Sequence, residues 1–266
     1  MHTPTVLTIA GFDPYGGAGI QIDTKTIHAL GGYALSSVTA MTAQNSKGVR
    51  AVEPVSANML RLQLTTLLDD MKVDAVKIGM LANSALIEVV AEVIKTYRLT
   101  NVVLDPVLVS SSGKALLDSE AVEQMVFKLF PLCRLITHNL DETNTLLKSH
   151  FQGSAKETSK MAEGLFSLGA RNILLKGGHT QEHNAVDYLI ELSSRTHFST
   201  PRVNTSHTHG TGCLLSSAIA TYLAKGEKLS ESVKQAKHFL YKKLQESSKM
   251  YLPYREKSSG RKEPIF

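Results

Sequence analysis

The chain has no tryptophan, only two cysteines among 266 residues, and few aromatic side chains, 6% in all. Two cysteines cannot form a disulfide framework, and Cys133 lies inside the apolar run 130–136, so we expect free thiols and a reducing, cytoplasmic compartment. Apolar runs fall well short of the roughly 18 residues that span a membrane, and the stretch 6–10 is too short for a signal peptide. We therefore expect neither a membrane protein nor a disulfide-stapled one.

An excess of one charge is also missing over most of the chain, although the formal net charge is +5. From residue 225 onward there are 11 Lys and Arg against 5 Asp and Glu, whereas the rest of the chain is nearly balanced. A solvated helix face followed by a charged tail accounts for this surplus. Aromatic residues do not alternate with the basic ones, as base stacking would require, so we expect no nucleic-acid partner.

Strand-like apolar runs alternate with longer helical segments through the first two-thirds of the chain. The runs are 6–10, 35–43, 75–78, 102–104, 135–137 and 173–175. Apolar residues of the segments 59–71 and 83–97 recur at helical spacing, which gives each segment one face that can cover a sheet. The alternation predicts an α/β fold built on a mainly parallel sheet with flanking helices.

The pattern changes after the last of these strands. Two further strands, 186–192 and 195–203, follow each other closely and predict an antiparallel hairpin at the sheet edge. The chain length suits one large domain, which we place at residues 1–252. Residues 253–266 are rich in charge and poor in apolar side chains, so we expect a flexible tail there.

The segment His209-Gly210-Thr211-Gly212-Cys213 runs directly into an apolar, helix-like stretch, 214–220. Its glycines allow backbone angles that a β-carbon forbids, so successive N–H groups can converge on one anionic ligand. The unpaired amides of a helix start and the helix dipole favour the same ligand, which predicts a phosphate site. The dipole would also lower the pKa of Cys213, although a simple glycine turn followed by a buried structural cysteine is an equal alternative.

Polar residues follow several of the predicted strands, at the edge where open parallel sheets bind ligands. Asp105 comes directly after the strand 102–104 and could hold a magnesium ion or its waters. Asn139 and Glu142 begin a helix after the next strand, where Glu142 either completes a capping box or binds metal. Lys176 ends another strand beside two glycines, and its ammonium group could neutralise transferring phosphoryl oxygens.

Three further features carry weaker predictions. The glycine-rich turn 11–19 lets a small molecule approach the backbone, but it lacks both the dinucleotide-binding spacing and the Gly-Lys-Ser/Thr of a P-loop. The segment 110–114 is a candidate lid, because its serines and glycine permit motion and Lys114 could close onto phosphate. A zinc site is not expected, since no cysteine pair accompanies the histidines His179, His183, His207 and His209.

Six short motifs follow one another along nearly the whole chain. They are Gly16-Gly17-Ala18-Gly19-Ile20-Gln21, Thr42-Ala43-Gln44-Asn45, Lys77-Ile78-Gly79-Met80-Leu81, Asp105-Pro106-Val107, Lys176-Gly177-Gly178-His179 and Thr208-His209-Gly210-Thr211-Gly212-Cys213. Together they resemble the hydroxymethylpyrimidine/phosphomethylpyrimidine kinase family of the ribokinase-like superfamily. The resemblance implies a three-layer ribokinase-like sandwich. It also implies an enzyme of thiamine biosynthesis that phosphorylates 4-amino-5-hydroxymethyl-2-methylpyrimidine to its monophosphate and then to the diphosphate.

The resemblance further implies cofactors, partners and roles for individual residues. ATP and Mg²⁺ would be required, a monovalent cation such as K⁺ is allowed, and the partners would be a small-molecule substrate and a second copy in a homodimer. The positions for pyrimidine binding would be Gly11, Ala18, Asp23, Gln44, Met80 and Val107. The positions for ATP binding would be Asn139, Lys176, Thr208, Gly210, Thr211 and Gly212. Phosphoryl transfer would depend on Lys176, Gly210, Gly212 and Cys213, and magnesium binding on Asp105 and Glu142.

Two of these implied roles have a chemical rationale in the residue types. The carboxamide of Gln44 offers a donor and an acceptor side by side, which suits the amine and ring nitrogen of an aminopyrimidine. Cys213 stands where sugar kinases of the superfamily carry an aspartate base. We expect the thiol to act as a modest base or to orient the alcohol.

The chain departs from the family pattern at four positions, Phe12, Tyr15, His138 and His207. Phe12 and Tyr15 border the implied pyrimidine pocket, so fine substrate preference stays open. The two histidines flank implied ATP and magnesium residues without replacing one. The usual Gly/His-rich C-terminal ending of the family is replaced by the charged tail.

Three other functions compete with the implied one. A pyridoxal-type kinase shares the fold and the chemistry, but Gln44 and Met80 favour the aminopyrimidine. A non-catalytic pyrimidine-binding sensor would have kept the pocket and lost transfer, which the complete set of transfer residues disfavours. A thiol hydrolase built on Cys213 and His209 would work without nucleotide and lacks an evident orienting partner in the sequence.

Overall fold

The computed structural model describes residues 2–109, 116–154, 156–177, 184–205 and 208–247. The strands are β1 (Thr5–Phe12), β2 (Tyr33–Asn45), β3 (Gly48–Pro54), β4 (Ala75–Ile78), β5 (Val102–Leu104), β6 (Leu135–His138), β7 (Asn172–Leu175), β8 (Asn184–Glu191) and β9 (Ser194–Pro201). The helices are α1 (Gly19–Ala29), α2 (Ala57–Asp70), α3 (Ser84–Thr96), α4 (Ser119–Leu129), the short 3₁₀ turn η1 (Phe130–Leu132), α5 (Leu140–Leu147), α6 (Thr158–Ser167), α7 (Thr211–Ala224) and α8 (Leu229–Gln245). No helix within these ranges is both long and apolar enough to cross a membrane.

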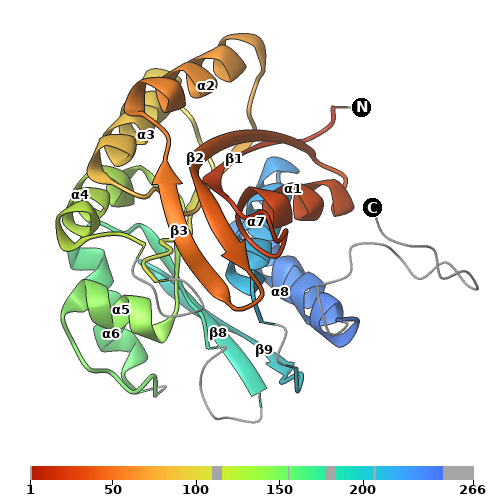
Figure 1. Ribbon diagram of the computed structural model, residues 1–266. Helices are drawn as coiled ribbons and strands as arrows, with labels where there is room; N and C mark the ends of the chain where they lie inside the picture. Colours follow the sequence, from red (N-terminus) through yellow and green to blue (C-terminus); the bar gives the residue numbers. More distant parts are fainter. Residues whose placement is uncertain (1, 110–115, 155, 178–183, 206–207, 248–266) are drawn as a thin grey trace, which may run out of the picture.

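One sheet runs through the described part of the molecule, in the strand order β3-β2-β1-β4-β5-β6-β7-β8-β9. The strands from β2 to β7 pair in parallel, whereas β3 at one edge and β8 and β9 at the other are antiparallel. Figure 1 shows α2, α3 and α4 on one side of this sheet and α1, α7 and α8 on the other. The three-layer α/β sandwich expected from the resemblance is therefore confirmed.

Alternating side chains of the central strands supply the two apolar layers that hold the sandwich together. In β1, Val6 packs toward the layer of α1, α7 and α8, whereas its neighbour Leu7 packs toward the layer of α2, α3 and α4. The same alternation occurs in β5, where Val103 and Leu104 are both fully buried on opposite faces. Burial on both faces explains why the parallel strands are continuous apolar runs in the sequence.

The predicted strands all appear in the structure, and the hairpin of β8 and β9 lies at the sheet edge as expected. The structure adds β3, which the sequence interpretation missed, as a second antiparallel edge strand. Its side chains are exposed or half-buried, so it has no apolar run to mark it. The segments predicted as a flexible tail, 253–266, and as a candidate lid, 110–114, lie outside the described residues.

Parallel pairing brings the carboxyl ends of β1, β4, β5, β6 and β7 to the same edge of the sheet. The sequence places a polar or glycine-containing segment after each of these ends. The α7 helix packs against β1, β4 and β5, so its amino end lies at this edge as well. The fold thus collects residues that are far apart in the chain into one region.

Candidate active site

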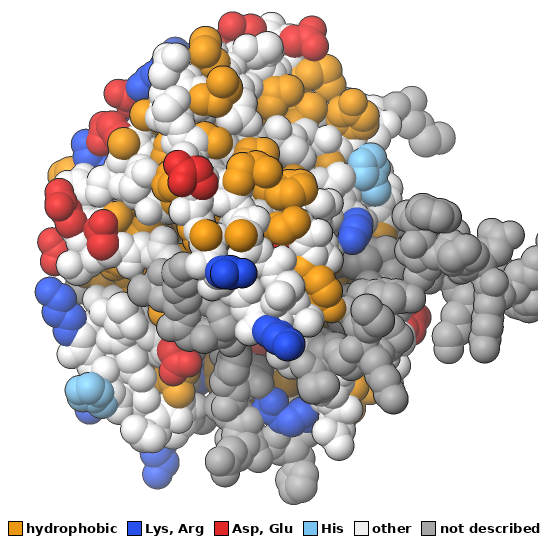
Figure 2. Space-filling view, viewed as in Figure 1, with side chains coloured by type: hydrophobic (Ala, Val, Ile, Leu, Met, Phe, Trp, Pro, Cys, Tyr) orange, Lys and Arg blue, Asp and Glu red, His pale blue; other side chains and the backbone are white. Residues whose placement is uncertain are grey.

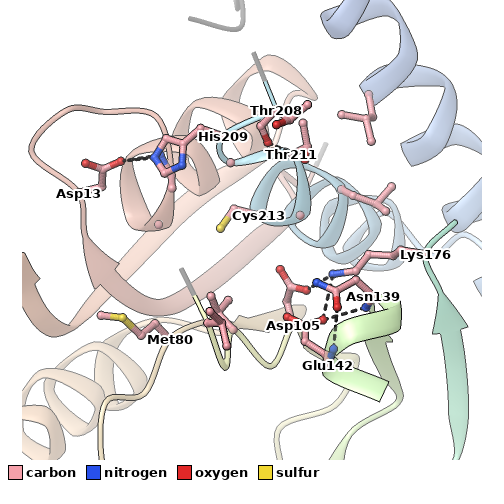
Figure 3. Close-up of a pocket in the computed structure, with 18 of the residues that line it drawn as sticks. Asp13, Met80, Asp105, Asn139, Glu142, Lys176, Thr208, His209, Thr211 and Cys213 are labelled. Atoms are coloured by element: carbon pink, nitrogen blue, oxygen red, sulfur yellow. Dashed lines mark hydrogen bonds and ion pairs between the residues drawn. The ribbon is translucent and has the colours of Figure 1, made fainter. Parts of the chain in front are cut away.

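A cavity of about 670 Å³ lies along the carboxyl edge of the sheet. Figure 3 shows its two groups of polar side chains, Asp13 with His209 on one side and Asp105, Asn139, Glu142 and Lys176 on the other, with Cys213 between them. Predicted site residues that line the cavity are Gly11, Ala18, Gln44, Met80, Asp105, Val107, Asn139, Glu142, Lys176, Thr208, Gly210, Thr211, Gly212 and Cys213. Of the predicted set, Asp23 alone does not belong to the described lining.

Asp105 and Lys176 form a close ion pair at the ends of β5 and β7, with 2.7 Å between Oδ1 and Nζ. Thr137 donates a hydrogen bond to the same carboxylate oxygen, also at 2.7 Å. Burial disfavours the charge on Asp105, but the ammonium groups of Lys176 and Lys77 outweigh burial and hold the pKa of this carboxyl below its usual value. Burial likewise works against the charge on Lys176, yet Asp105 and Glu142 raise its pKa. Both groups are therefore ionised at neutral pH.

Asn139 and Glu142 form the capping box that their spacing predicts. The Asn139 side chain accepts from the Glu142 amide at 2.7 Å, and the Glu142 carboxylate accepts from the Asn139 amide at 2.8 Å. The cap does not remove Glu142 from the site, because its carboxylate also lies 3.8 Å from Lys176 Nζ. Burial raises the pKa of Glu142 to about 7, against the opposing pull of Lys176.

The α7 helix begins at Thr211, and its N-cap Gly210 has the left-handed φ of +80°. A side chain at Gly210 would overlap the carbonyl oxygen of Gly17, so only glycine fits this cap. No side chain of the described residues caps the helix start, and the first-turn residues Gly212 and Cys213 line the cavity, so the amino end of α7 faces it. Gly212 lies within the helix and has no left-handed backbone. Its missing side chain leaves space for Asp105, since a β-carbon there would lie 3.2 Å from Asp105 Oδ2.

The prediction that the helix start lowers the pKa of Cys213 is wrong. Burial raises the pKa of this thiol to about 11, although the Lys77 ammonium group and a hydrogen bond with the Gly19 backbone act in the opposite direction. The helix dipole acts over the first turn only and is worth less than the loss of solvent around the sulfur. At neutral pH Cys213 is a thiol, which suits it to orient a substrate and makes it a poor nucleophile or base.

At the other side of the cavity, His209 connects the glycine-rich turn to β2. Its Nε2 lies 3.1 Å from Asp13 Oδ2 and 3.0 Å from Gln44 Nε2. Asp13 also accepts hydrogen bonds from the amides of Tyr15 and Ala18, both at 2.9 Å. A proton on Nε2 favours donation to Asp13, whereas a free lone pair there accepts from Gln44, so the imidazole tautomer helps to orient the Gln44 carboxamide.

Asp23 lies beneath the cavity instead of lining it. Its side chain is fully buried, accepts from Ser217 at 2.6 Å and from Thr8 at 2.5 Å, and pairs with Lys77 Nζ at 2.8 Å. Lys77 itself belongs to the cavity lining. Burial lowers and Asp23 raises the pKa of Lys77, and the net shift is upward, so the lysine stays charged. Asp23 thus holds a buried cation under the site rather than contacting a ligand.

The positions that depart from the family pattern fall in different surroundings. Phe12 lines the cavity, whereas Tyr15 lies outside the described lining, with its ring centroid 6.4 Å from that of His209. His138 is fully buried at the end of β6, and neither ring nitrogen has a hydrogen-bond partner among the described residues. His207 lies outside the described residues.

Sequence reasoning missed three residues of this region, Asp13, Lys77 and Lys237. Asp13 had a signal, because an Asp followed by Pro and glycines is typical of a turn in which the carboxylate accepts local amides. Lys77 had a weaker one, a lysine at the end of an apolar strand. Nothing in the local sequence marks Lys237, which sits among other lysines on α8 and lines the cavity.

Comparison with known proteins places this geometry in one family. The sequence profile of phosphomethylpyrimidine kinase matches residues 13–254. A hydroxymethylpyrimidine/phosphomethylpyrimidine kinase of Salmonella typhimurium is 41% identical over 240 residues, which is 90% of each chain. The crystal structure of a phosphomethylpyrimidine kinase from Clostridium difficile 630 is similar with a TM-score of 0.79, at 37% identity over 90% of this chain and 98% of that one.

The fold is shared with a second kind of vitamin kinase. The pyridoxal kinase of Staphylococcus aureus, solved with AMP-PCP and pyridoxal, has a TM-score of 0.86 at 29% identity, over 94% of this chain and 91% of that one. The similarity to the phosphomethylpyrimidine kinases is higher in sequence, and their profile extends over nearly all of the described residues. This chain belongs to the phosphomethylpyrimidine kinase family.

Proposed function

We propose that this enzyme transfers phosphate from ATP to 4-amino-5-hydroxymethyl-2-methylpyrimidine and then to the resulting monophosphate, in thiamine biosynthesis. The observation that carries the proposal is one cavity that joins three parts: the Gln44 carboxamide, the uncapped start of α7, and the Asp105–Lys176 pair. Phosphoryl transfer requires positioning and charge neutralisation more than covalent chemistry. These three parts supply a ring-binding group, an anion site and a fixed cation.

The chain's own residues divide the work as follows. The Gln44 carboxamide, oriented by His209, binds the aminopyrimidine edge. The neutral Cys213 thiol, at the start of α7, orients the attacking hydroxymethyl group. The amides of the first turn of α7 receive the transferring phosphoryl group, and Lys176 neutralises charge on the ATP phosphates. Lys77, held by Asp23, adds positive potential beneath the sulfur.

The donor set fits a magnesium ion that is bound together with the nucleotide. Asp105 and Glu142 are two carboxylates that converge on Lys176. Among the described residues no group of three or more His, Cys, Asp or Glu could hold a metal by protein ligands alone. Magnesium in kinases commonly takes one or two carboxylates and completes its shell with water and substrate phosphates. Bound there, the ion would supply charge neutralisation on the phosphates.

Pyridoxal is the alternative acceptor, and the residues facing the ring distinguish it. Pyridoxal kinases share the fold, and the Staphylococcus aureus enzyme was solved with pyridoxal. Here the ring end of the cavity is lined by Gln44, Met80, Val107 and Phe12. The paired donor and acceptor of Gln44 match an amine next to a ring nitrogen, which the aminopyrimidine has and pyridoxal lacks. The aminopyrimidine is therefore the favoured acceptor.

The test is transfer from magnesium-ATP to the pyrimidine alcohol, with products identified by mass spectrometry and pyridoxal assayed in parallel. We expect both the mono- and the diphosphate, and a higher kcat/KM for the pyrimidine than for pyridoxal. A Lys176→Met variant should bind the pyrimidine and lose most of the turnover, since it removes the cation and keeps the side-chain length. Pyrimidine binding by the wild type without transfer would identify a sensor, and a preference for pyridoxal would overturn the choice of acceptor.

We also propose that the enzyme is a homodimer. Apolar side chains appear among charged ones over α2, β2 and β3 in Figure 2, and Met41, Met59 and Leu62 are each about half exposed. These residues lie on β2 and α2, which pack against each other, so they form a candidate contact surface for a second copy. Sedimentation velocity should give a dimer mass for the wild type and a shift toward monomer for a Met41→Glu variant.

A further inference from the structure

A further buried ion pair lies at the cavity, besides Asp105–Lys176 and Asp23–Lys77. Lys237 on α8 and Asp187 on β8 approach to 2.7 Å, and each is only about 5% exposed. Both residues line the cavity. Isolated charges are rarely buried unless they are paired, and such a pair seldom adds net stability over apolar packing. Stability alone therefore does not explain the pair.

The Asp187 carboxylate is shared between Lys237 and Gly177, the residue after Lys176. Its Oδ1 accepts a hydrogen bond from the Gly177 amide at 2.9 Å, while Oδ2 binds Lys237. The Lys176 amide is itself bonded to the His138 carbonyl oxygen at 2.7 Å. The peptide groups on both sides of Lys176 are therefore fixed, one by β6 and one by Asp187.

Gly177, the residue after Lys176, has no room for a side chain. A β-carbon at Gly177 would overlap the carbonyl oxygen of Val186, the residue before Asp187. Close packing of this kind means that a shift of β8 moves Gly177 with it. The direction of the Lys176 side chain toward Asp105 thus depends on where Asp187 is held.

Lys237 belongs to the helix face that closes one end of the cavity. Leu240, Tyr241 and Leu244 follow it at intervals of three, four and seven residues, which places them on the same side of α8, and all three line the cavity. Val203, on the chain segment after β9, also lines the cavity. Because α8 contacts β9, and β8 and β9 follow β7 in the strand order on the side away from β2, this apolar face lies on the Lys176 side of the cavity and suits the base of a nucleotide.

We propose that the Asp187–Lys237 pair is a positioning device for the nucleotide, which couples the backbone at Lys176 and Gly177 to the apolar face of α8. The inference rests on the proposed use of ATP. The pair would position two contacts to the nucleotide at once: Lys176 on the phosphates and the apolar face of α8 on the base. Its loss should weaken nucleotide binding and leave pyrimidine binding at the opposite end unchanged.

The experiment compares Lys237→Met, Asp187→Asn and the double variant with the wild type. Lys234→Met is the matched control, because Lys234 lies one turn earlier on α8, 67% exposed and paired with Glu231. ADP binding is measured by calorimetry, and kcat and the KM values for ATP and pyrimidine by steady-state kinetics. Urea unfolding verifies that each variant is folded. If one single variant fails to fold, the double variant still tests the inference, because it leaves no unpaired buried charge.

We expect each single variant to bind ADP about tenfold more weakly and to raise the KM for ATP by a similar factor, as for residues coupled through a shared contact. The double variant should be no worse than the weaker single one, and Lys234→Met should match the wild type. ADP binding retained in Asp187→Asn and lost in Lys237→Met would mean that Lys237 contacts the nucleotide directly, and would overturn the inference.

Two other results would also overturn it. Wild-type ADP affinity in all variants would reduce the pair to a structural role, and equal rises in the KM values for ATP and pyrimidine would indicate general loosening. Failure of the proposed function is recognised separately. A wild type that binds ADP but transfers nothing to the pyrimidine contradicts the choice of acceptor, while the ADP comparison still decides the role of the pair.

Discussion

The buried imidazole of His138 predicts that this enzyme loses stability in mild acid and that one substitution removes the loss. The side chain is fully buried at the end of β6 against the Phe130 ring, with 5.8 Å between ring centroids. Burial, together with the nearby Lys176 ammonium group, lowers the pKa of His138 from 6.5 to about 3. The folded chain therefore keeps this imidazole neutral at pH values where the unfolded chain protonates it.

The sign and the size of this pH effect on the free energy of unfolding follow from proton linkage. Between about pH 6.5 and pH 3 the unfolded state holds one more proton than the folded state, so the free energy of unfolding falls as pH falls. The change is about 1.4 kcal/mol per pH unit below the unfolded pKa, which gives about 2 kcal/mol by pH 5. Above about pH 7.5 both states are neutral and the contribution vanishes.

The perturbation is His138→Leu, which keeps a similar volume and removes two ring nitrogens that lack partners among the described residues. At about pH 7.5 the variant should be more stable than the wild type by about 1 to 2 kcal/mol, because an unsatisfied buried polar group is removed. At about pH 5 the difference should widen by about a further 2 kcal/mol.

The assay is urea unfolding followed by circular dichroism at both pH values. His150→Leu, a matched change at an exposed histidine, serves as the control and should show the pH dependence of the wild type. The reasoning is refuted if His138→Leu and the wild type lose stability in parallel on acidification. A variant that is less stable than the wild type at pH 7.5 would show that favourable contacts of the imidazole ring outweigh the cost of its unpaired nitrogens.

Three further predictions concern the cavity. Cys213→Ala should lower kcat and leave the shape of its pH profile between about pH 6 and 9 unchanged, because a thiol whose pKa is about 11 is neutral throughout that range. A rise of the wild-type kcat near the ordinary thiol pKa that disappears in the variant would instead indicate that Cys213 acts as a base. His209→Ala should raise the KM for the pyrimidine about tenfold by releasing Gln44, and leave the KM for ATP unchanged. Equal changes in both KM values would argue against this orienting role of His209. Lys77→Met should destabilise the protein by about 3 to 5 kcal/mol in urea unfolding, since it strands the Asp23 carboxylate, and an added Asp23→Asn should recover part of the loss.

The parallel part of the sheet could be predicted from the sequence because its strands are buried on both faces. Continuous apolar runs mark such strands whatever their neighbours are. The edge strand β3 could not be found in this way, since its side chains are exposed or half-buried and its pairing with β2 is fixed by the turn between them. The strand order itself is a property of long-range packing that no local window contains.

The candidate site was predictable where its residues are at strand ends or in a helix cap. Asp105, Lys176 and the Asn139–Glu142 cap follow from that rule, and the structure brings them together. The failures share another cause, long-range contacts. The Asp13–His209 contact joins residues 196 positions apart. The raised pKa of Cys213 similarly depends on burial by distant segments, which overrides the local effect of the helix start.

The sheet order has a consequence for how such an enzyme can change its substrate during evolution. Gln44 comes from β2 and Lys176 from the end of β7, with β1, β4, β5 and β6 between them. Adjacent strands lie about 4.8 Å apart, so the separation of the two ends of the cavity is set by backbone pairing and not by loops. Substitutions around the ring can therefore select a different alcohol without displacing the phosphate donor. Acceptor choice and transfer chemistry are separable traits on this scaffold, and one can drift while the other is preserved.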